Sequence, residues 1–515
     1  MAPPAKIFTR DQVREQSSAD SLLCVIDSTV YDVTDFVDVH PGGETVLREV
    51  AGQDATTAFY NLHRHEVLVK YSDLAIGTIE GEAPQVIAMK PGELSQVPYA
   101  EPLWLAAPFR SPYYGKSHHR LQRAMRDFVD RHLYPEAQEC EATGRYISQD
   151  MIDQMSKLGI LHMRMGPGKH LHGVELMGGG IVDGKDFDYF HDLIVSQELA
   201  RVMARGFQEG NMMGMTIGLP AVLNFANDKA WMKTICDNVF SGRKKICLAI
   251  SEAFAGSDVA GIRTTARKTP DGKHYIVNGT KKWITNGTWC DYFVTAVRTE
   301  KGLSVLLIER GEGVETKPIK TSYSPTAGTS YVTFDNVKVP AANLLGEEGQ
   351  GMRIILSNFN HERWMLVCFS VRWARSIVEE TLKWSNQRRI FEKRLVDQPV
   401  IRQKLAKMIS LVEANQAWLE TITYQMCHMP YSQQAKHLAG PIGLLKMNTT
   451  RAAHEIADES VQIWGGRGIT QTGMGKFVEM FNRAYKFDAI LGGSEEILGD
   501  LGVKQAIKNF PKAML

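Results

Sequence analysis

Residues 248–258 read Leu-Ala-Ile-Ser-Glu-Ala-Phe-Ala-Gly-Ser-Asp, and residues 278–287 read Asn-Gly-Thr-Lys-Lys-Trp-Ile-Thr-Asn-Gly. Short β-rich runs lie around these two stretches, and Gly, Pro, Asp and Asn separate them. The runs are residues 275–277, 292–297, 303–308 and 331–334. Short strands with such breaks are typical of a small sandwich or barrel. We therefore expect a β-domain over residues 241–345.

Helical periodicity lies on both sides of this β-region. Apolar residues recur at three- and four-residue spacing over 119–132 and 148–158 before it. Long helical segments follow it, for example 403–426 and 442–462. Helices that flank a β-domain on both sides predict a three-part enzyme body. Its parts are a helical domain over 117–240, the β-domain over 241–345 and a C-terminal helical domain over 346–515.

Residues 1–82 form a separate small α+β unit with its own start and stop. The following residues, 83–116, are rich in proline and lose periodicity, which indicates an extended, semi-rigid linker. The alternative is a strap packed on the next domain, and the apolar run Leu103-Trp104-Leu105 favours this for part of the segment.

The small unit carries Val-Tyr-Asp-Val-Thr-Asp-Phe-Val-Asp-Val-His-Pro-Gly-Gly at 30–43, and Ala-Gly-Gln-Asp-Ala-Thr-Thr-Ala-Phe at 51–59. Both stretches resemble the cytochrome b5 family, whose signature is His-Pro-Gly-Gly. The resemblance implies that His40 supplies an imidazole to a haem iron. Pro41 and the glycines would turn the chain tightly before a helix that begins near Glu44.

A second axial histidine must then face His40 across the haem, and His63 and His65 are the candidates. We favour His63, because the b5-like domain of flavocytochrome lactate dehydrogenases also has Leu-His after the Phe; His65 remains the alternative. Two histidine ligands leave no open coordination position. A haem b in this unit therefore implies one-electron transfer and not oxygen activation.

The stretches 248–258 and 278–287 resemble two motifs of the acyl-CoA dehydrogenase family at the family's spacing, and the resemblance covers roughly 118–510. We therefore expect a multidomain α+β chain. A cytochrome b5-like haem domain would precede an acyl-CoA dehydrogenase fold made of a helical domain, a β-domain and a C-terminal helical bundle. The resemblance implies FAD as the second cofactor and an acyl-CoA as the substrate.

The family motifs assign site residues to this chain. Trp283 is the expected wall against the flavin ring, and Arg388 is expected at the FAD pyrophosphate, where a planar guanidinium suits phosphate. The FAD contacts implied by resemblance are Leu248, Ile250, Ser251, Trp283, Thr285, Arg388, Phe391, Gln462, Gly466, Ser494 and Glu496. The substrate contacts implied are Ser257, Asn360, Arg363 and Gly492.

The segment around Arg388 resembles one that reaches the FAD of a neighbouring subunit, which implies a homodimer or homotetramer. Several positions depart from the family pattern. Ala253 and Phe254 replace a Pro and a Gly, whereas Glu392 and Pro399 replace a Gly and a Gln. These changes affect the expected loop shape and the adenine-side contacts.

Dehydrogenation needs a carboxylate that removes the α-proton. Many family members place a Glu where this chain has Gly492, so the usual base is missing. Long-chain and isovaleryl members instead carry the Glu on an earlier helix, immediately before an Arg, as Glu362-Arg363 stands here. We therefore predict Glu362 as the base, with a pKa raised by an apolar pocket. The backbone N–H of Gly492 would stabilise the thioester oxygen. Glu495 is displaced from the family position and is a poor rival.

The predicted function is FAD-dependent α,β-dehydrogenation of an acyl-CoA, with electrons passed to the fused haem. A downstream electron acceptor is a further expected partner. The alternatives are an acyl-CoA oxidase that uses oxygen, enoyl-CoA reduction fed by the haem, and a non-enzymatic nucleic-acid-binding relative. A formal net charge of +1 gives no support for a nucleic-acid partner. No long apolar run predicts a membrane span.

The expected location is intracellular, with the compartment open. The N-terminus lacks the apolar run of a secretory signal. The cysteines are far apart and form no CxxC pair, as in a reducing compartment. The C-terminal Ala513-Met514-Leu515 resembles a peroxisomal tripeptide only faintly.

Overall fold

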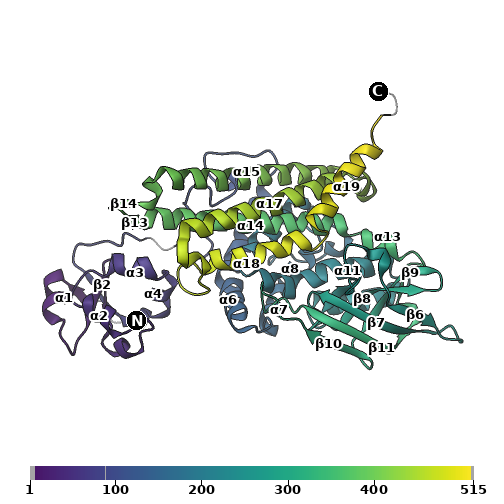
Figure 1. The fold of residues 1–515 in the computed structure, drawn as a ribbon, viewed down its shortest axis with the longest axis horizontal. Helices are drawn as coiled ribbons and strands as arrows, with labels where there is room; N and C mark the ends of the chain where they lie inside the picture. The colour runs from purple at the N-terminus through teal and green to yellow at the C-terminus, as the bar shows by residue number, and fades with distance from the viewer. Residues whose placement is uncertain (1–5, 87–88, 512–515) are drawn as a thin grey trace. The chain divides into compact units, whose positions relative to one another are not determined.

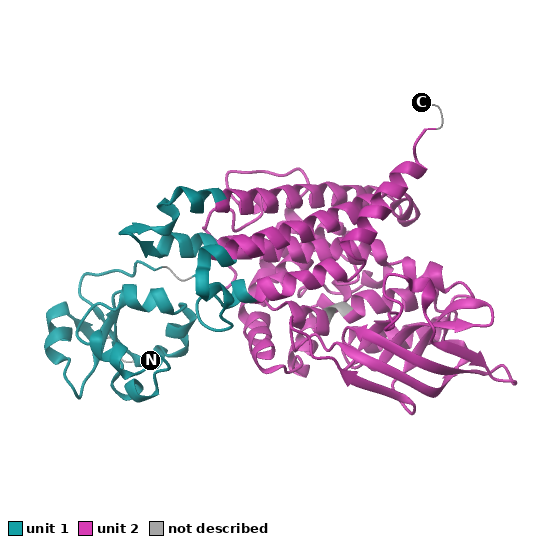
Figure 2. Ribbon diagram, in the orientation of Figure 1, with its two compact units in different colours: residues 1–90, 381–403, 461–479 teal, residues 91–380, 404–460, 480–515 magenta. Residues whose placement is uncertain are grey.

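The computed structural model describes residues 6–86 and 89–511. The C-terminal tripeptide and residues 87 and 88 of the expected linker lie outside this part. The chain divides into two compact units (Figure 2). Unit 1 comprises Met1–Lys90, Thr381–Gln403 and Val461–Glu479, and unit 2 comprises Pro91–Glu380, Lys404–Ser460 and Met480–Leu515.

The N-terminal part of unit 1 is a four-stranded sheet with helices, and the sheet has the strand order β1-β4-β3-β2. Side chains of β2 alternate between the two faces of the sheet, as the strand period requires. Cys24 and Ile26 enter one apolar cluster, whereas Leu23 and Val25 enter another. The elements are β1 (Lys6–Phe8), α1 (Arg10–Gln16), β2 (Leu23–Ile26), β3 (Thr29–Asp32), η1 (Thr34–Val39), α2 (Glu44–Glu49), α3 (Thr56–Leu62), α4 (Glu66–Lys70), η2 (Ser72–Leu74) and β4 (Ala75–Ile79).

The second half of the proline-rich segment is packed on unit 2, as the alternative of a strap predicts for this part. Trp104 is buried in the short helix η3 (Leu103–Leu105) and stacks on Tyr114 with ring centroids 3.9 Å apart. Glu101 is buried between two arginines, 2.5 Å from Arg126 and 3.1 Å from Arg372. A buried carboxylate needs such partners, so these ion pairs attach the strap to the helices of unit 2.

Helices precede the β-domain in unit 2. Helix α9 (Tyr189–Ala200) is buried along almost its whole length, and Asp188 caps its first turn by accepting hydrogen bonds from the N–H groups of Phe190 and His191. The other elements are α5 (Lys116–Phe128), η4 (Val129–Leu133), α6 (Tyr134–Thr143), α7 (Gln149–Lys157), α8 (Ile160–Met163), η5 (Lys169–Leu171), α10 (Arg205–Gln208), η6 (Glu209–Met213), α11 (Gly214–Phe225) and α12 (Lys229–Phe240).

The β-domain is one sheet with the order β10-β11-β7-β6-β8-β9-β12, and β5 pairs in parallel with β8 (Figure 1). Its core contains buried side chains such as Phe293 and Phe334, whose rings meet edge to face. The elements are β5 (Ile246–Ala249), η7 (Val259–Gly261), β6 (Thr265–Lys268), β7 (His274–Ile284), β8 (Tyr292–Thr299), β9 (Gly302–Glu309), β10 (Val314–Pro318), β11 (Ser330–Pro340), η8 (Ala341–Asn343) and β12 (Leu344–Leu345).

Long helices make up the C-terminal region, where α14, α15, α17 and α18 run alongside one another (Figure 1). No helix among the described residues is both long and apolar enough to cross a membrane. The elements are α13 (Gly351–Leu356), α14 (Phe359–Gln387), β13 (Arg389–Ile390), β14 (Lys393–Arg394), η9 (Leu395–Asp397), α15 (Pro399–His428), α16 (Tyr431–His437), α17 (Ala439–Trp464), η10 (Gly465–Ile469), α18 (Lys476–Ile490) and α19 (Glu495–Lys508).

Candidate active site and haem site

The haem domain brings His40 and His63 close together, with ring centroids 6.0 Å apart and the ring planes at 44° to each other. A nitrogen–metal bond of about 2 Å leaves room for one metal ion between the facing edges. Each ring donates from Nδ1 to a backbone carbonyl, His40 to Gly43 at 3.0 Å and His63 to Phe59 at 3.3 Å. Nε2 of each ring therefore keeps its lone pair for a metal.

His65 lies in a different environment. Its Nδ1 is 3.0 Å from the hydroxyl of Tyr60, and the two rings are stacked. Gly42 leaves room for the ring of His40, because a Cβ at position 42 would be 2.7 Å from this imidazole. The same domain exposes four apolar side chains, and a bound haem needs an apolar surface of this kind: Val39, Val46, Leu62 and Val69. These features fit a haem between His40 and His63.

The first flavin motif is anchored by a buried ion pair. Lys281 on β7 is fully buried, and its Nζ donates to the backbone carbonyl of Ile250 at 3.0 Å and to Glu252 at 2.8 Å. Glu252 also accepts hydrogen bonds from the N–H and the hydroxyl of Thr264. The backbone carbonyl of Ser251 accepts a hydrogen bond from the N–H of Lys282. These contacts hold residues 250–252 to β7 and align the two family motifs.

Trp283 has the features of a wall for a planar ligand. Its backbone φ is +68°, a costly value for a bulky residue, and its side chain is 53% exposed. Nearby in sequence, Asn286 also has a positive φ and is buried, and no described residue donates to its Oδ1. Thr285 is half-buried between them. An exposed aromatic in a strained backbone and an unsatisfied buried oxygen fit a bound flavin.

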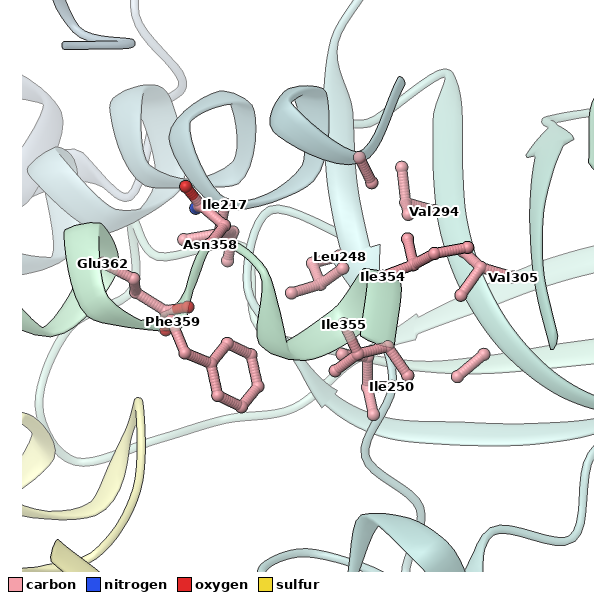
Figure 3. A pocket seen from close by; sticks show the side chains of 12 residues that line it. Ile217, Leu248, Ile250, Val294, Val305, Ile354, Ile355, Asn358, Phe359 and Glu362 are labelled. Carbon is pink, nitrogen blue, oxygen red and sulfur yellow. The ribbon is translucent and has the colours of Figure 1, made fainter. Parts of the chain in front are cut away.

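Glu362 lies at the end of a pocket lined mainly by apolar side chains (Figure 3). All lining side chains except Asn358 and Glu362 are apolar. The apolar lining residues are Ile217, Ala221, Leu248, Ile250, Val294, Ala296, Val305, Ile354, Ile355 and Phe359. Glu362 is only 5% exposed, and no described residue donates a hydrogen bond to its Oε2. Burial raises the pKa of Glu362, although Arg363, Lys446 and His361 oppose the rise.

Gly492 lies directly against this carboxylate. A Cβ at position 492 would be 3.3 Å from Oε1 of Glu362 and 2.9 Å from Cδ1 of Leu366. Arg363 donates from Nε to the carbonyl of Gly492 at 2.8 Å. Glu495 lies elsewhere, because it accepts from Thr450 at 2.8 Å and pairs with Arg451. The structure therefore brings Glu362, Arg363 and Gly492 together and leaves Glu495 in helix packing.

The remaining predicted residues are distributed between the units. Of the substrate set, Ser257 is exposed, and Asn360 donates to the Gln434 carbonyl at 3.5 Å. Ser494 caps α19, and Glu496 is exposed in its first turn. The others lie in unit 1 and are Arg388, Phe391, Gln462 and Gly466. Phe391 is 87% exposed, and a Cβ at Gly466 would meet nothing within 4 Å, so both leave space for a ligand.

Sequence reasoning missed three residues that support the site: Lys281, Lys446 and Asp192. Asp192 is fully buried on α9 and lies 2.7 Å from His361, the residue before Glu362. Lys446 on α17 is buried and donates to the Gly493 carbonyl at 2.9 Å. Their partners are far away in the chain, so no local motif marks them.

Comparisons with known proteins agree with this geometry. The chain matches the cytochrome b5-like heme/steroid binding domain over residues 9–80. It also matches the N-terminal, middle and C-terminal domains of acyl-CoA dehydrogenase over 115–236, 247–337 and 349–507.

Individual proteins give the same result. The acyl-CoA dehydrogenase apdG of Emericella nidulans is 37% identical, covering 81% of this chain and 97% of that protein. The acyl-CoA dehydrogenase AFT10-1 of Alternaria alternata is 35% identical over the same shares. A solved putative acyl-CoA dehydrogenase from Mycobacterium smegmatis superposes with a TM-score of 0.68 at 25% identity, covering 78% of this chain and all of that one.

The predicted fold class is thus confirmed, and the cofactors are FAD and haem. The chain belongs to the acyl-CoA dehydrogenase family and carries a cytochrome b5 domain at its N-terminal end.

Proposed function

We propose that the chain dehydrogenates an acyl-CoA thioester at its α,β bond with Glu362 as the base, and that the electrons pass to the haem of its own cytochrome b5 domain. The observation that carries the first part is the position of Glu362. Its buried carboxylate ends an apolar pocket and occupies the space that Gly492 leaves open. An acyl chain would fill the pocket with its α-carbon toward this carboxylate.

The chemistry follows from these residues. Glu362 takes the α-proton, the electron pair of that C–H bond forms the new double bond, and hydride leaves the β-carbon. When bound, FAD accepts this hydride, and the haem iron accepts single electrons. A buried carboxylate with a raised pKa is a stronger base than one in water. The N–H of Gly492 would stabilise the thioester oxygen as charge develops on it.

The residues that would hold FAD are those named above in the two units. Leu248, Ile250, Ser251, Trp283 and Thr285 would contact the ring from the β-domain. The segment with Arg388 and Phe391 and the loop with Gln462 and Gly466 would contact the dinucleotide. We propose that these last contacts reach the FAD of a neighbouring subunit in a homodimer or homotetramer.

Contacts within unit 1 support electron transfer to the haem. The segment that precedes and follows His63 contacts the same loops that we assign to FAD. Arg467 donates to the Asn61 carbonyl at 3.3 Å, and Gln387 donates to the Tyr60 carbonyl. Arg64 donates to the Met474 carbonyl at 3.4 Å. The haem ligand segment is thus joined to the proposed dinucleotide loops.

The test compares two carboxylates on a panel of straight-chain and branched acyl-CoA thioesters with a dye as acceptor. Glu362→Gln should lower turnover by about 10²–10⁴-fold, the usual contribution of a positioned base. Glu495→Gln is the matched control and should keep turnover within a few-fold. Undiminished turnover of Glu362→Gln would remove Glu362 as the base.

Electron transfer is tested separately by anaerobic stopped-flow mixing with the best substrate of the panel. The expected result is loss of flavin absorbance followed by reduction of the haem. Flavin reduction without haem reduction would rule out the haem as acceptor. Peroxide release in air would then identify oxygen as the acceptor.

A further inference from the structure

Two cations from different helices hold the loop at Gly492 and Gly493. Arg363 on α14 donates to the Gly492 carbonyl at 2.8 Å, and Lys446 on α17 donates to the Gly493 carbonyl at 2.9 Å. The two glycines have φ values of +66° and +108°. Neighbouring carbonyls in a left-handed backbone are therefore fixed by two charged donors, and this loop lies against Glu362.

Lys446 is only 1% exposed, and burial of an ammonium group is costly without a negative partner. In the described parts of the chain, its hydrogen bond is to a neutral carbonyl. The carboxylates whose charge reaches it belong to Asp488, Glu362 and Glu495. Asp488 is bound to Arg205, and Glu495 is bound to Thr450 and Arg451. Glu362 is the one with an oxygen that no described donor binds.

Glu362 and Lys446 also flank the same glycine. A Cβ at Gly492 would be 3.3 Å from Oε1 of Glu362 and 3.8 Å from Cε of Lys446. The stem of the lysine and the carboxylate therefore both lie close to one backbone position. Both the charge and the packing connect Lys446 to the proposed base.

We propose that Lys446 is a positioning residue for the dehydrogenation. It holds the Gly492–Gly493 loop through the Gly493 carbonyl and places a buried positive charge beside the carboxylate of Glu362. The proposal rests on the proposed function, in which Glu362 is the base. It gives the lysine two separable tasks, one that depends on its hydrogen bond and one that depends on its charge.

Two further cations, Arg363 and His361, lie on the same helix as Glu362 and lower its pKa in the same direction as Lys446. Arg363 donates to the Gly492 carbonyl, and His361 pairs with Asp192 at 2.7 Å. Glu209 on η6 acts in the opposite direction, because the negative charges of Glu209 and Glu362 repel. Loss of the Lys446 charge should therefore raise the pKa of Glu362 further.

The test measures kcat/KM against pH for the holoenzyme with the best substrate of the acyl-CoA panel. The variants are Lys446→Gln, which keeps a donor without charge, Lys446→Met, which keeps neither, and Lys446→Arg, which keeps both. Lys504→Met changes an exposed lysine of α19 and is the matched control. Activity of a base rises with pH as the carboxylate ionises, so the acid limb reports the pKa of Glu362.

We expect the acid limb of Lys446→Gln to move up by about one pH unit, which is a tenfold loss of kcat/KM on that limb. Lys446→Met should show the same shift and a lower kcat, whereas Lys446→Arg and Lys504→Met should keep the original limb. A role in packing alone would lower thermal stability without moving the limb, and that result overturns the proposal. If Lys446→Met does not fold, Lys446→Gln and Lys446→Arg decide.

The outcome is separable from that of the proposed function. Glu362→Gln that retains turnover refutes Glu362 as the base, whatever the lysine variants do. If Glu362→Gln has no turnover but Lys446→Gln keeps the original acid limb, Glu362 stays the base and the proposed role of Lys446 is refuted.

Discussion

Gly492 stands so close to Glu362 that a Cβ at position 492 would make a tight contact with the carboxylate. A Cβ there would be 3.3 Å from Oε1 of Glu362, and it would be still closer to Leu366. The φ of +66° at Gly492 also favours glycine over any other residue. The carboxylate at position 362 and the absence of a side chain at position 492 therefore belong to one packing arrangement.

The first prediction concerns this constraint. Gly492→Ala should lower kcat at least tenfold, because the methyl group pushes against the carboxylate and moves it from the α-carbon. The matched control is Gly180→Ala, since Gly180 has φ +68° and a Cβ there would meet nothing within 4 Å. The control should lose about 1–2 kcal/mol of stability from backbone strain and keep kcat. Steady-state kinetics and thermal unfolding measure both, and equal effects on kcat would contradict the packing argument.

The fold could be predicted from the sequence because each part carries local patterns. The motif at 248–258 and the helical periods on both sides need only neighbouring residues. The pair of Glu252 and Lys281 could not be predicted in this way, since it joins the loop after β5 to strand β7 through buried side chains. Lys446 reads as an ordinary helix lysine, and only the packing of α17 on the loop at Gly493 shows its contact.

Glu392 shows how a departure from a family motif can keep the backbone. The sequence places a glutamate where the family has glycine, a departure that affects the expected adenine-side contacts. In the structure Phe391 and Glu392 have φ values of +47° and +63° between the paired strands β13 and β14. A two-residue hairpin turn requires positive φ at both positions. The left-handed turn is retained, and the Glu392 side chain is accommodated at a cost in backbone strain.

The second prediction separates His63 from His65. His63→Ala should abolish the spectrum of a six-coordinate haem with two imidazole ligands, because the His63 ring lies 6.0 Å from the His40 ring and its Nδ1 is bound to the Phe59 carbonyl, which leaves Nε2 for the iron. His65→Ala removes a side chain that contacts Tyr60 and should leave the spectrum intact. Absorbance spectra of the oxidised and reduced holoprotein measure the result. The reverse pattern would make His65 the ligand.

The third prediction concerns the contacts beside His63. Arg64→Ala removes a guanidinium that lies 4.6 Å from the centre of the Phe477 ring and donates to the Met474 carbonyl. The haem ligand segment is then held less closely to the loops assigned to FAD. Electron transfer from flavin to haem should slow, because the two cofactors are no longer held in a fixed geometry. Haem reduction in stopped-flow experiments should slow several-fold, whereas flavin reduction by substrate should keep its rate.

Arg48 is the matched control for this experiment, since it is exposed and pairs with Glu44 within one helix. Arg48→Ala should keep both rates. Slower flavin reduction in Arg64→Ala would mean that the change acts on the active site and not on the contact between the segments.

The last prediction is a pH dependence of stability that comes from a buried cluster. Arg205 lies between two carboxylates, Asp488 and Glu209, and all three side chains are almost fully buried. Asp488 accepts from Nε of Arg205 at 3.0 Å, whereas no described donor makes a well-formed hydrogen bond to the oxygens of Glu209. Burial, more than any other cause, raises the pKa of Glu209 to about 7.

Because the folded-state pKa is raised, this group contributes its full stability below its unfolded pKa of about 4.5. The contribution is lost as the pH rises through about 7, at up to about 1.4 kcal/mol per pH unit. Glu209→Gln mimics the protonated form and should escape this loss. Its unfolding midpoint relative to the wild type should therefore rise by a few degrees between pH 5 and pH 8. Glu312→Gln changes an exposed residue and should show no such rise. A flat difference for Glu209→Gln would mean that Glu209 is ionised throughout and that Arg205 pairs with both carboxylates at once.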